Sequence, residues 1–140
     1  MKIDTTRFGP LEVAPEQLFH FPEGLAGLPG KSWVLHQPNG HARLGWLQSA
    51  EDPAVAVVIA EPSVLFPDYA PKHRPEEASA VDEGPREYWV LVRQGPTPGQ
   101  LLANLFAPLV LNREKRLGVQ LPLVGSDFGL AEPWPKEPPV

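Results

Sequence analysis

Nineteen prolines and twelve glycines interrupt the 140 residues of this chain. Proline removes a backbone N–H and disrupts a helix from within, so this density excludes long helices. The stretches between the interruptions are short and rich in β-branched and aromatic residues, as strands are. The sequence therefore predicts a mainly β fold, which we expect to be a small antiparallel β-barrel or barrel-like sandwich with at most one or two short helices.

Segments with a strand pattern follow one another closely along the chain. They cover residues 2–8, 11–14, 18–21, 33–36, 43–48, 55–60, 88–93 and 119–123. The segment 55–60 is apolar on both faces, which predicts a central strand. The dipeptide Asn39-Gly40 predicts a tight hairpin. In 119–123, apolar positions alternate with a glutamine and a proline, which favours an edge strand with one buried face.

The run 101–118 is apolar, yet it carries an asparagine and a proline. Asn104 stands among apolar neighbours, and an amide buried there must find hydrogen-bond partners or cost about 1–3 kcal/mol. Pro108 cannot donate to a strand ladder and belongs at an edge or a bulge. We expect Asn104 to tie a bulged strand to a loop, and a contact with a partner protein is its alternative role.

Two segments lack a strand pattern. Residues 70–87 are polar, and Pro75 followed by two glutamates could start one short helix. Residues 132–140 are rich in proline, and we expect a flexible, extended C-terminal tail there. Residues 1–131 are expected to form a single β domain.

Composition limits the possible partners. No cysteine is present, which excludes disulfides and thiolate metal sites and fits a reducing cytoplasm. No apolar run approaches the roughly 18 residues of a membrane span, and the first residues lack the apolar core of a signal peptide, so we expect neither a membrane span nor a signal peptide. The formal net charge of -5 disfavours nucleic-acid binding. This charge suits a basic partner protein, and it is equally compatible with an ordinary soluble surface.

No arrangement typical of a catalytic site is recognisable in the sequence. The histidines stand apart, at positions 20, 36, 41 and 73, outside any metal-binding spacing. The glycine-rich segment 24–30 lacks the lysine and hydroxyl residue of a phosphate-binding loop, so we interpret it as a tight loop. The acid pairs 51–52 and 76–77 are sequence neighbours, whose side chains point apart on extended backbone. We therefore expect no enzyme, no metal and no cofactor.

Five motifs follow one another along residues 1–124. They are Ile3-Asp4-Thr5 with Phe8-Gly9 and Glu12; Phe21-Pro22-Glu23-Gly24-Leu25; Trp46-Leu47-Gln48-Ser49 with Glu51-Asp52-Pro53; Glu61-Pro62 with Phe66-Pro67-Asp68-Tyr69; and Ala103-Asn104-Leu105 with Ala107-Pro108-Leu109-Val110, Asn112, Arg116, Gly118 and Gln120. In this order they resemble the motifs of FliW, a family of flagellar assembly factors. The chain departs from the family at Ala26, where a proline is usual, and in 70–87, where prolines interrupt a region that is often an acidic helix.

The resemblance implies both a fold and a function. FliW-like proteins are small, β-barrel-like, non-enzymatic regulators of the cytoplasm that switch between two partners. They bind newly made flagellin, and when free they bind CsrA, an RNA-binding translational repressor. Binding CsrA relieves the repression of flagellin synthesis, and the family precedent favours an allosteric antagonism over competition with RNA. An acidic protein of this family can attract the basic surface of CsrA at long range.

Six residues that belong to these motifs are candidates for contact with a partner protein. They are Glu51, Asp52, Phe66, Asp68, Tyr69 and Asn104. A rigid loop that presents an aromatic ring and a carboxylate suits a basic partner, because it loses little entropy on binding. Structural roles are the alternatives: a turn at Glu51-Asp52, a core contact for Phe66, and a Tyr69 that caps the core with its hydroxyl at the rim.

Two further classes of function are compatible with a small β fold. A small ligand could bind inside the barrel, which would require a cavity, whereas barrels of this size are usually filled by side chains. A generic protein-interaction scaffold would bind through its surface without a preference for flagellin or CsrA.

Overall fold

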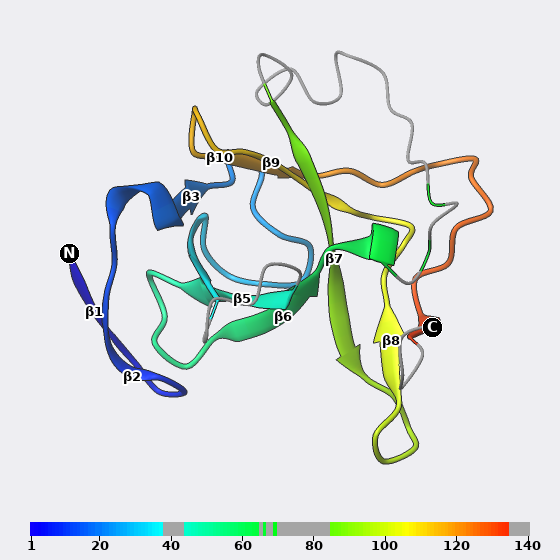
Figure 1. The fold of residues 1–140 in the computed structure, drawn as a ribbon, viewed down its shortest axis with the longest axis horizontal. Helices are drawn as coiled ribbons and strands as arrows, with labels where there is room; N and C mark the ends of the chain where they lie inside the picture. The colour runs from blue at the N-terminus through cyan, green and yellow to red at the C-terminus, as the bar shows by residue number, and fades with distance from the viewer. Residues whose placement is uncertain (38–43, 65, 67–68, 70–84, 135–140) are drawn as a thin grey trace.

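The computed structural model describes residues 1–37, 44–64, 66, 69 and 85–134 (Figure 1). Its strands are β1 (Lys2–Thr5), β2 (Gly9–Glu12), β3 (Leu18–His20), β4 (Ser32–His36), β5 (Leu44–Ser49), β6 (Ala56–Ala60), β7 (Glu87–Gln94), β8 (Leu101–Ala103), β9 (Leu109–Asn112), β10 (Leu117–Gln120) and β11 (Glu132–Trp134). Two short 3-10 turns, η1 (Pro15–Gln17) and η3 (Pro62–Val64), are the helical elements of this part of the chain. The mainly β prediction is confirmed.

Seven strands close into a barrel in the order β7, β6, β5, β4, β3, β10 and β9. The barrel closes because β9 pairs with β10 on one side and with β7 on the other. All of these pairings are antiparallel except that of β3 with β10, where Leu117 lies opposite His20. The prediction that 55–60 is a central strand is correct, since β6 pairs with β5 and with β7.

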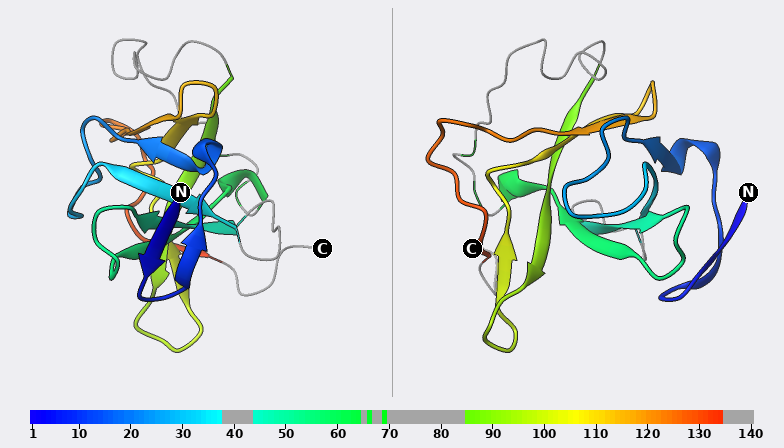
Figure 2. Two further views of the ribbon diagram at one scale, coloured as in Figure 1. Left: turned by 90° about the vertical axis from the view of Figure 1, so that its left-hand side faces the viewer. Right: turned by 180° about the vertical axis from the view of Figure 1, so that it is seen from behind.

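Strand β7 is the longest strand and belongs to two parts of the sheet. Its first residues pair with β9 and complete the barrel, whereas its last residues pair with β8. Strand β11 pairs with the other side of β8, so β8 and β11 extend the sheet beyond the barrel (Figures 1 and 2).

Side chains fill the barrel. The buried residues of this inner core are Phe19, Phe21, Leu25, Trp33, Leu35, Leu47, Ile59, Trp89, Leu109 and Leu111. Those that lie on strands occupy inward-facing, alternate positions, such as Trp33 and Leu35 on β4 and Leu109 and Leu111 on β9. The segment 24–30 contributes Leu25 and Leu28 to the same core, so the glycine-rich loop closes one end of the barrel.

A second core lies outside the barrel, against β7 and β8. It contains Ala60, Val90, Val92, Ala103 and Leu105, with Val58, Phe66, Tyr69 and Phe128 packed on it. Strand β7 serves both cores, because Trp89 points into the barrel while Val90 points out of it. A strand that packs against two cores has to be apolar on both faces, as β7 is.

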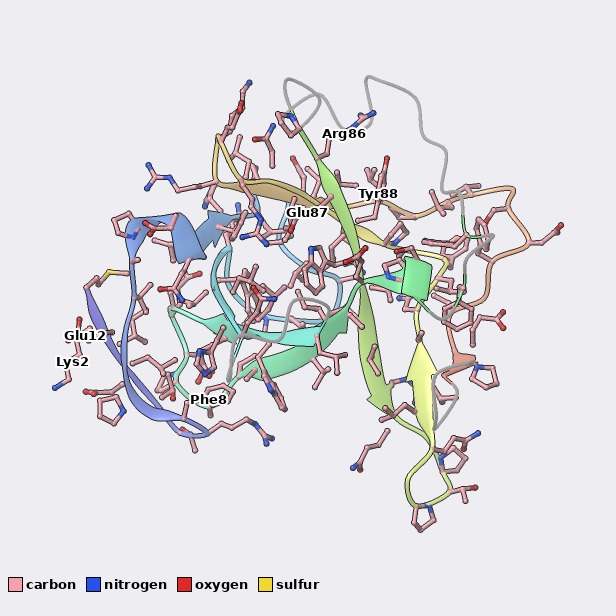
Figure 3. The ribbon with its side chains drawn as sticks, viewed as in Figure 1. Lys2, Phe8, Glu12, Arg86, Glu87 and Tyr88 are labelled. Atoms are coloured by element: carbon pink, nitrogen blue, oxygen red, sulfur yellow. The ribbon has the colours of Figure 1, made fainter. Side chains whose placement is uncertain are left out.

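The hairpin of β1 and β2 packs on the outer face of the barrel beside β4 and β5 (Figure 3). The ring of Phe8 lies edge-on to His36 and Trp46, at centroid distances of 4.5 and 5.5 Å. The guanidinium of Arg7 lies 4.6 Å from the centre of the Trp46 ring, and Thr6 N–H donates to the carbonyl of Pro53. Aromatic stacking and one backbone hydrogen bond therefore hold the hairpin in place.

One sequence expectation is confirmed by the pairing and one is corrected. Val119 and Gln120 pair with β9, whereas β10 pairs with β3 only at Leu117, so among the described strands the segment 119–123 has a partner on one side, as predicted for an edge strand. Its alternate residues Val119, Leu121 and Leu123 are buried, which is the one buried face that was predicted. The expected tail at 132–140 begins with a paired strand, because β11 aligns Glu132 with Ala103 and Trp134 with Leu101. A segment that contains proline looks unpaired in sequence when its partner strand comes from a distant segment.

Other expectations fall outside the described residues. These are the Asn39-Gly40 hairpin, the short helix at Pro75 and the end of the tail at 135–140. Within the described part of the chain, no helix is long and apolar enough to cross a membrane.

Candidate functional site

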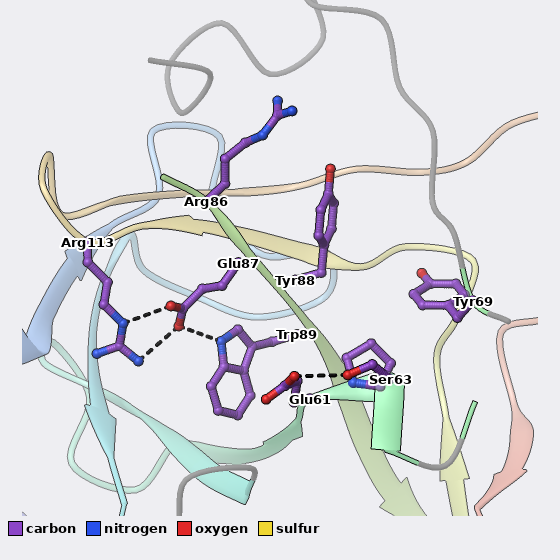
Figure 4. A pocket seen from close by; sticks show the side chains of 9 residues that line it. Glu61, Ser63, Tyr69, Arg86, Glu87, Tyr88, Trp89 and Arg113 are labelled. Carbon is purple, nitrogen blue, oxygen red and sulfur yellow. Dashed lines mark hydrogen bonds and ion pairs between the residues drawn. The ribbon is translucent and has the colours of Figure 1, made fainter. Parts of the chain in front are cut away.

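A pocket of about 480 Å³ opens on the surface near the start of β7 (Figure 4). Its lining comes from three places in the sequence: the segment after β6, the first residues of β7, and the turn after β9. The lining residues are Glu61, Pro62, Ser63, Tyr69, Arg86, Glu87, Tyr88, Trp89 and Arg113. The pocket therefore combines aromatic rings with charges of both signs.

An ion pair forms one wall of the pocket. The Nε and Nη2 atoms of Arg113 each donate to one carboxylate oxygen of Glu87, both at 2.9 Å. The indole Nε1 of Trp89 donates to the same carboxylate at 2.8 Å. Glu87 and Trp89 are two residues apart on β7 and so project from the same side of the strand. Three donors thus occupy the Glu87 carboxylate, and two of them form the fork geometry typical of arginine.

A second carboxylate lies on another wall. Glu61 precedes the 3-10 turn η3, and its Oε1 accepts a hydrogen bond of 2.9 Å from the Ser63 hydroxyl (Figure 4). Pro62, which follows Glu61, is buried and starts the turn. The turn therefore fixes the position from which the Glu61 side chain enters the pocket.

Tyr69 is held by the body of the protein. Its hydroxyl donates to the carbonyl of Leu105 at 2.7 Å, and its ring lies edge-on to Phe128 at 4.7 Å. Burial, with a smaller contribution from nearby Tyr88, raises the pKa of the Tyr69 hydroxyl well above its ordinary value. Phe66 packs on the same outer core and its carbonyl accepts from Tyr69 N–H. Both aromatic candidates thus have structural contacts, although Tyr69 also lines the pocket.

Glu51 and Asp52 organise a turn away from the pocket. The carboxylate of Glu51 accepts hydrogen bonds from the backbone N–H groups of Ser32 and Lys31, which hold its pKa below the ordinary value. Asp52 accepts from Ala54 N–H at 3.0 Å, and the Ser49 hydroxyl accepts from the N–H groups of both acids. The geometry is that of a turn stabilised by side-chain acceptors.

Asn104 has the structural role that its apolar surroundings suggested. The side-chain Oδ1 of Asn104 accepts a hydrogen bond from Ala107 N–H at 3.0 Å, and the backbone N–H of Asn104 donates to the carbonyl of Leu91. The first bond lies in the break between β8 and β9, where Pro108 stands, and the second ties the end of β8 to β7. A contact with a partner remains a prediction for this residue.

The six candidates do not form one site. Phe66 and Tyr69 lie together on the outer core, Glu51 and Asp52 share a distant turn, and Asp68 is outside the described residues. The ion pair that shapes the pocket has no local signal in the sequence, because Glu87 and Arg113 are 26 residues apart. The motif that joins Glu61-Pro62 with Tyr69 was the available signal for this pocket.

Another, smaller cavity has a volume of about 250 Å³. Its lining is largely apolar and consists of Ala26, Leu28, Val57, Leu91, Val92, Arg93, Leu102, Asn104 and Leu130. Among the residues that the structure describes, no group of three or more histidine, aspartate or glutamate side chains could hold a metal ion. The polar pocket at β7 is therefore the stronger candidate site.

The fold and the pocket define a class: a small closed β-barrel whose interior is filled by side chains and whose polar chemistry lies on its surface. Comparison with known proteins identifies the family. The model of the FliW protein family matches residues 2–134, and the chain belongs to this family. The resemblance found in the sequence motifs is thus confirmed.

Relatives match along nearly the whole chain. A flagellar assembly factor FliW of Geotalea uraniireducens is 31% identical over 137 residues, which cover 96% of this chain and 84% of the relative. One from Desulfitobacterium hafniense is 33% identical and covers 93% of this chain and 88% of its own. A crystal structure of the flagellar assembly factor FliW superimposes with a TM-score of 0.82 at 29% identity, covering 98% of this chain and 99% of the other.

Proposed function

We propose that this protein is a flagellar assembly factor that binds flagellin and CsrA in a mutually exclusive way, and that its binding to CsrA relieves the repression of flagellin synthesis. The observation that carries the proposal is the family match over residues 2–134. Relatives and a solved structure with the name flagellar assembly factor support it. The protein acts without catalysis and in the cytoplasm, where flagellin is made.

The charge of the chain supports a basic partner. The formal net charge is -5. An RNA-binding repressor carries a basic surface, and surfaces of opposite charge accelerate encounter. Phosphate backbones would instead be repelled, so the protein binds RNA negligibly.

The filled barrel supports action through the outer surface. Trp33, Phe19 and Leu47 are fully buried inside it, so side chains already occupy the space that a small ligand would need. This arrangement favours the regulator over the small-ligand alternative.

Calorimetry with purified partners tests the proposal. The protein is titrated first with the cognate CsrA dimer and then, separately, with flagellin monomer. A preformed complex with CsrA is next titrated with flagellin, and we expect CsrA to be released as flagellin binds. Size-exclusion chromatography of the three-component mixture should show two binary complexes and no ternary one.

Two outcomes would contradict the proposal. Absence of heat and of complex with both partners would remove it altogether. A stable ternary complex would retain the binding but exclude the switch. An unrelated protein of similar size and acidity serves as the control, since any interaction that it shares reflects charge alone.

A further inference from the structure

The pocket near β7 contains two carboxylates with different hydrogen-bonding states. Glu87 is satisfied by two donors from Arg113 and one from Trp89. Glu61 accepts from Ser63 through Oε1. An ionised carboxylate offers about four acceptor sites on its two oxygens. Among the described residues, Glu61 therefore retains more acceptor capacity than Glu87.

The charges of the two arginines do not cancel that of Glu61. The guanidinium of Arg113 already forms a two-bond ion pair with Glu87, so its charge is compensated within the wall. The side chain of Arg86 extends away from Glu61 and Trp89 in Figure 4. A charged group entering beside Glu61 thus meets a local negative charge.

The other walls of the pocket are aromatic. Tyr69, Tyr88 and Trp89 all contribute to its lining. Aromatic faces attract cations, and arginine most often fills this role in proteins. A carboxylate next to aromatic faces is the combination that recognises a guanidinium or an ammonium group. The volume of about 480 Å³ is sufficient for one long side chain.

We propose that this pocket receives a cationic side chain, arginine or lysine, from the basic partner CsrA, with Glu61 as its acceptor in a pocket that Tyr69, Tyr88 and Trp89 also line. The inference rests on the proposed function, because that function supplies the partner. It goes further by assigning the contact to one pocket and one carboxylate. The turn after β6 and the start of β7 set the positions of the pocket and of the Glu61 carboxylate.

Affinity measurements on charge variants test the contact. Glu61→Gln keeps the shape of the side chain and removes its charge, and we expect it to weaken CsrA binding at least 10-fold, mainly through faster dissociation. Glu12→Gln removes one charge from the hairpin on the far side of the molecule (Figure 3), and we expect less than about a 2-fold change. Equal weakening by both variants, or none by Glu61→Gln, would overturn the inference.

A second readout is independent of CsrA. The indole N–H of Trp89 lines the pocket and gives its own signal in a ¹H–¹⁵N spectrum, which the Trp89→Phe variant assigns. A hexa-arginine peptide should shift this signal in the wild-type protein, with at least 10-fold lower affinity in Glu61→Gln. A peptide that shifts other signals and leaves Trp89 unmoved would exclude the pocket.

The two measurements separate the possible failures. If the wild-type protein does not bind CsrA, the proposed function is wrong, and the peptide experiment still reports on the pocket. If CsrA binds the wild type and Glu61→Gln equally, the function stands and the pocket assignment is wrong. If Glu61→Gln does not fold, Glu61→Asp replaces it in the test. Its shorter side chain keeps the charge but moves the carboxylate back toward the main chain, so it should also weaken binding.

Discussion

At the scale of residues, side-chain oxygens of this chain repeatedly accept hydrogen bonds from backbone N–H groups in turns. Glu51 binds the backbone of Lys31 and Ser32, and Asn104 binds that of Ala107. Asn112 does the same for Lys115 in the turn after β9. Loops between short strands leave many N–H groups without a ladder partner, and these side chains satisfy them.

The acceptor role of Glu51 predicts a dependence of stability on pH. The hydrogen bonds hold the folded-state pKa of Glu51 below its ordinary value of 4.5. A lowered folded-state pKa adds stability that is present above the unfolded-state pKa and is lost as the pH falls through the folded-state value. We therefore expect the melting temperature of the wild type to exceed that of Glu51→Gln at pH 7, and the difference to shrink below pH 4.5.

Glu114→Gln provides the control for this titration, because Glu114 is exposed in the turn after β9. Its effect on the melting temperature should be small at every pH. A difference between wild type and Glu51→Gln that stays constant down to the acid transition would show that the carboxylate charge is irrelevant.

The hydroxyl of Tyr69 predicts a stability effect that distinguishes its structural role from a binding role. Tyr69→Phe leaves the half-buried carbonyl of Leu105 without its donor, so we expect a loss of about 1 kcal/mol. A domain of this size responds with a decrease in melting temperature of several degrees. Calorimetry on the same preparation should give an unchanged CsrA affinity per folded molecule; weaker affinity without a change in melting would assign the hydroxyl to the interface.

At the scale of elements, the closure of the barrel depends on a close approach between β10 and the chain after β3. Gly118 lies on β10, and a Cβ atom added there would overlap the ring of Phe21. Phe21 is fully buried, so its ring has no free space into which to move. The glycine is thus required by packing, because a side chain would separate the parallel pair β3–β10.

This packing predicts a rescue experiment. Gly118→Ala should destabilise the protein by about 1–3 kcal/mol, the usual cost of overpacking a core. Replacing the ring in the double variant Gly118→Ala, Phe21→Leu should recover part of that loss relative to the sum of the single changes. Chemical denaturation of the four proteins measures the coupling. Additive effects would mean that the two positions do not contact each other.

Among the strands that the structure describes, β11 is at the edge of the extended sheet. Strand β11 pairs with β8 on one side and contains Pro133. Proline offers no N–H to a further strand, and edges with proline resist unwanted pairing between molecules. The proline that made this segment look like a tail is therefore compatible with an edge strand.

At the scale of the whole molecule, the net charge of -5 predicts how the complex with CsrA forms. If electrostatic attraction steers the encounter, raising the salt concentration from about 0.05 to about 0.5 M should slow association more than it speeds dissociation. Stopped-flow or surface-based kinetics at several salt concentrations measure both rates. Association that is independent of salt would restrict the role of charge to the bound state.

Several features of the protein could be predicted from local sequence. The spacing of prolines and glycines indicated short strands, and alternation placed the two-faced strand at 88–93, which is observed as β7. The isolated Asn104 indicated a structural amide. These predictions succeeded because proline geometry, alternation and the need of an amide among apolar residues for hydrogen-bond partners act within a few residues.

Pairing between distant segments could not be predicted in this way. The sequence determined the β class, the family motifs and the apolar residues that fill the barrel. Tertiary structure alone placed β10 between β3 and β9, paired β11 with β8, and joined Glu87 to Arg113 beside Glu61. The physical reason is that strand pairing and ion pairing depend on proximity in space, whereas sequence patterns report only which face of a strand is apolar.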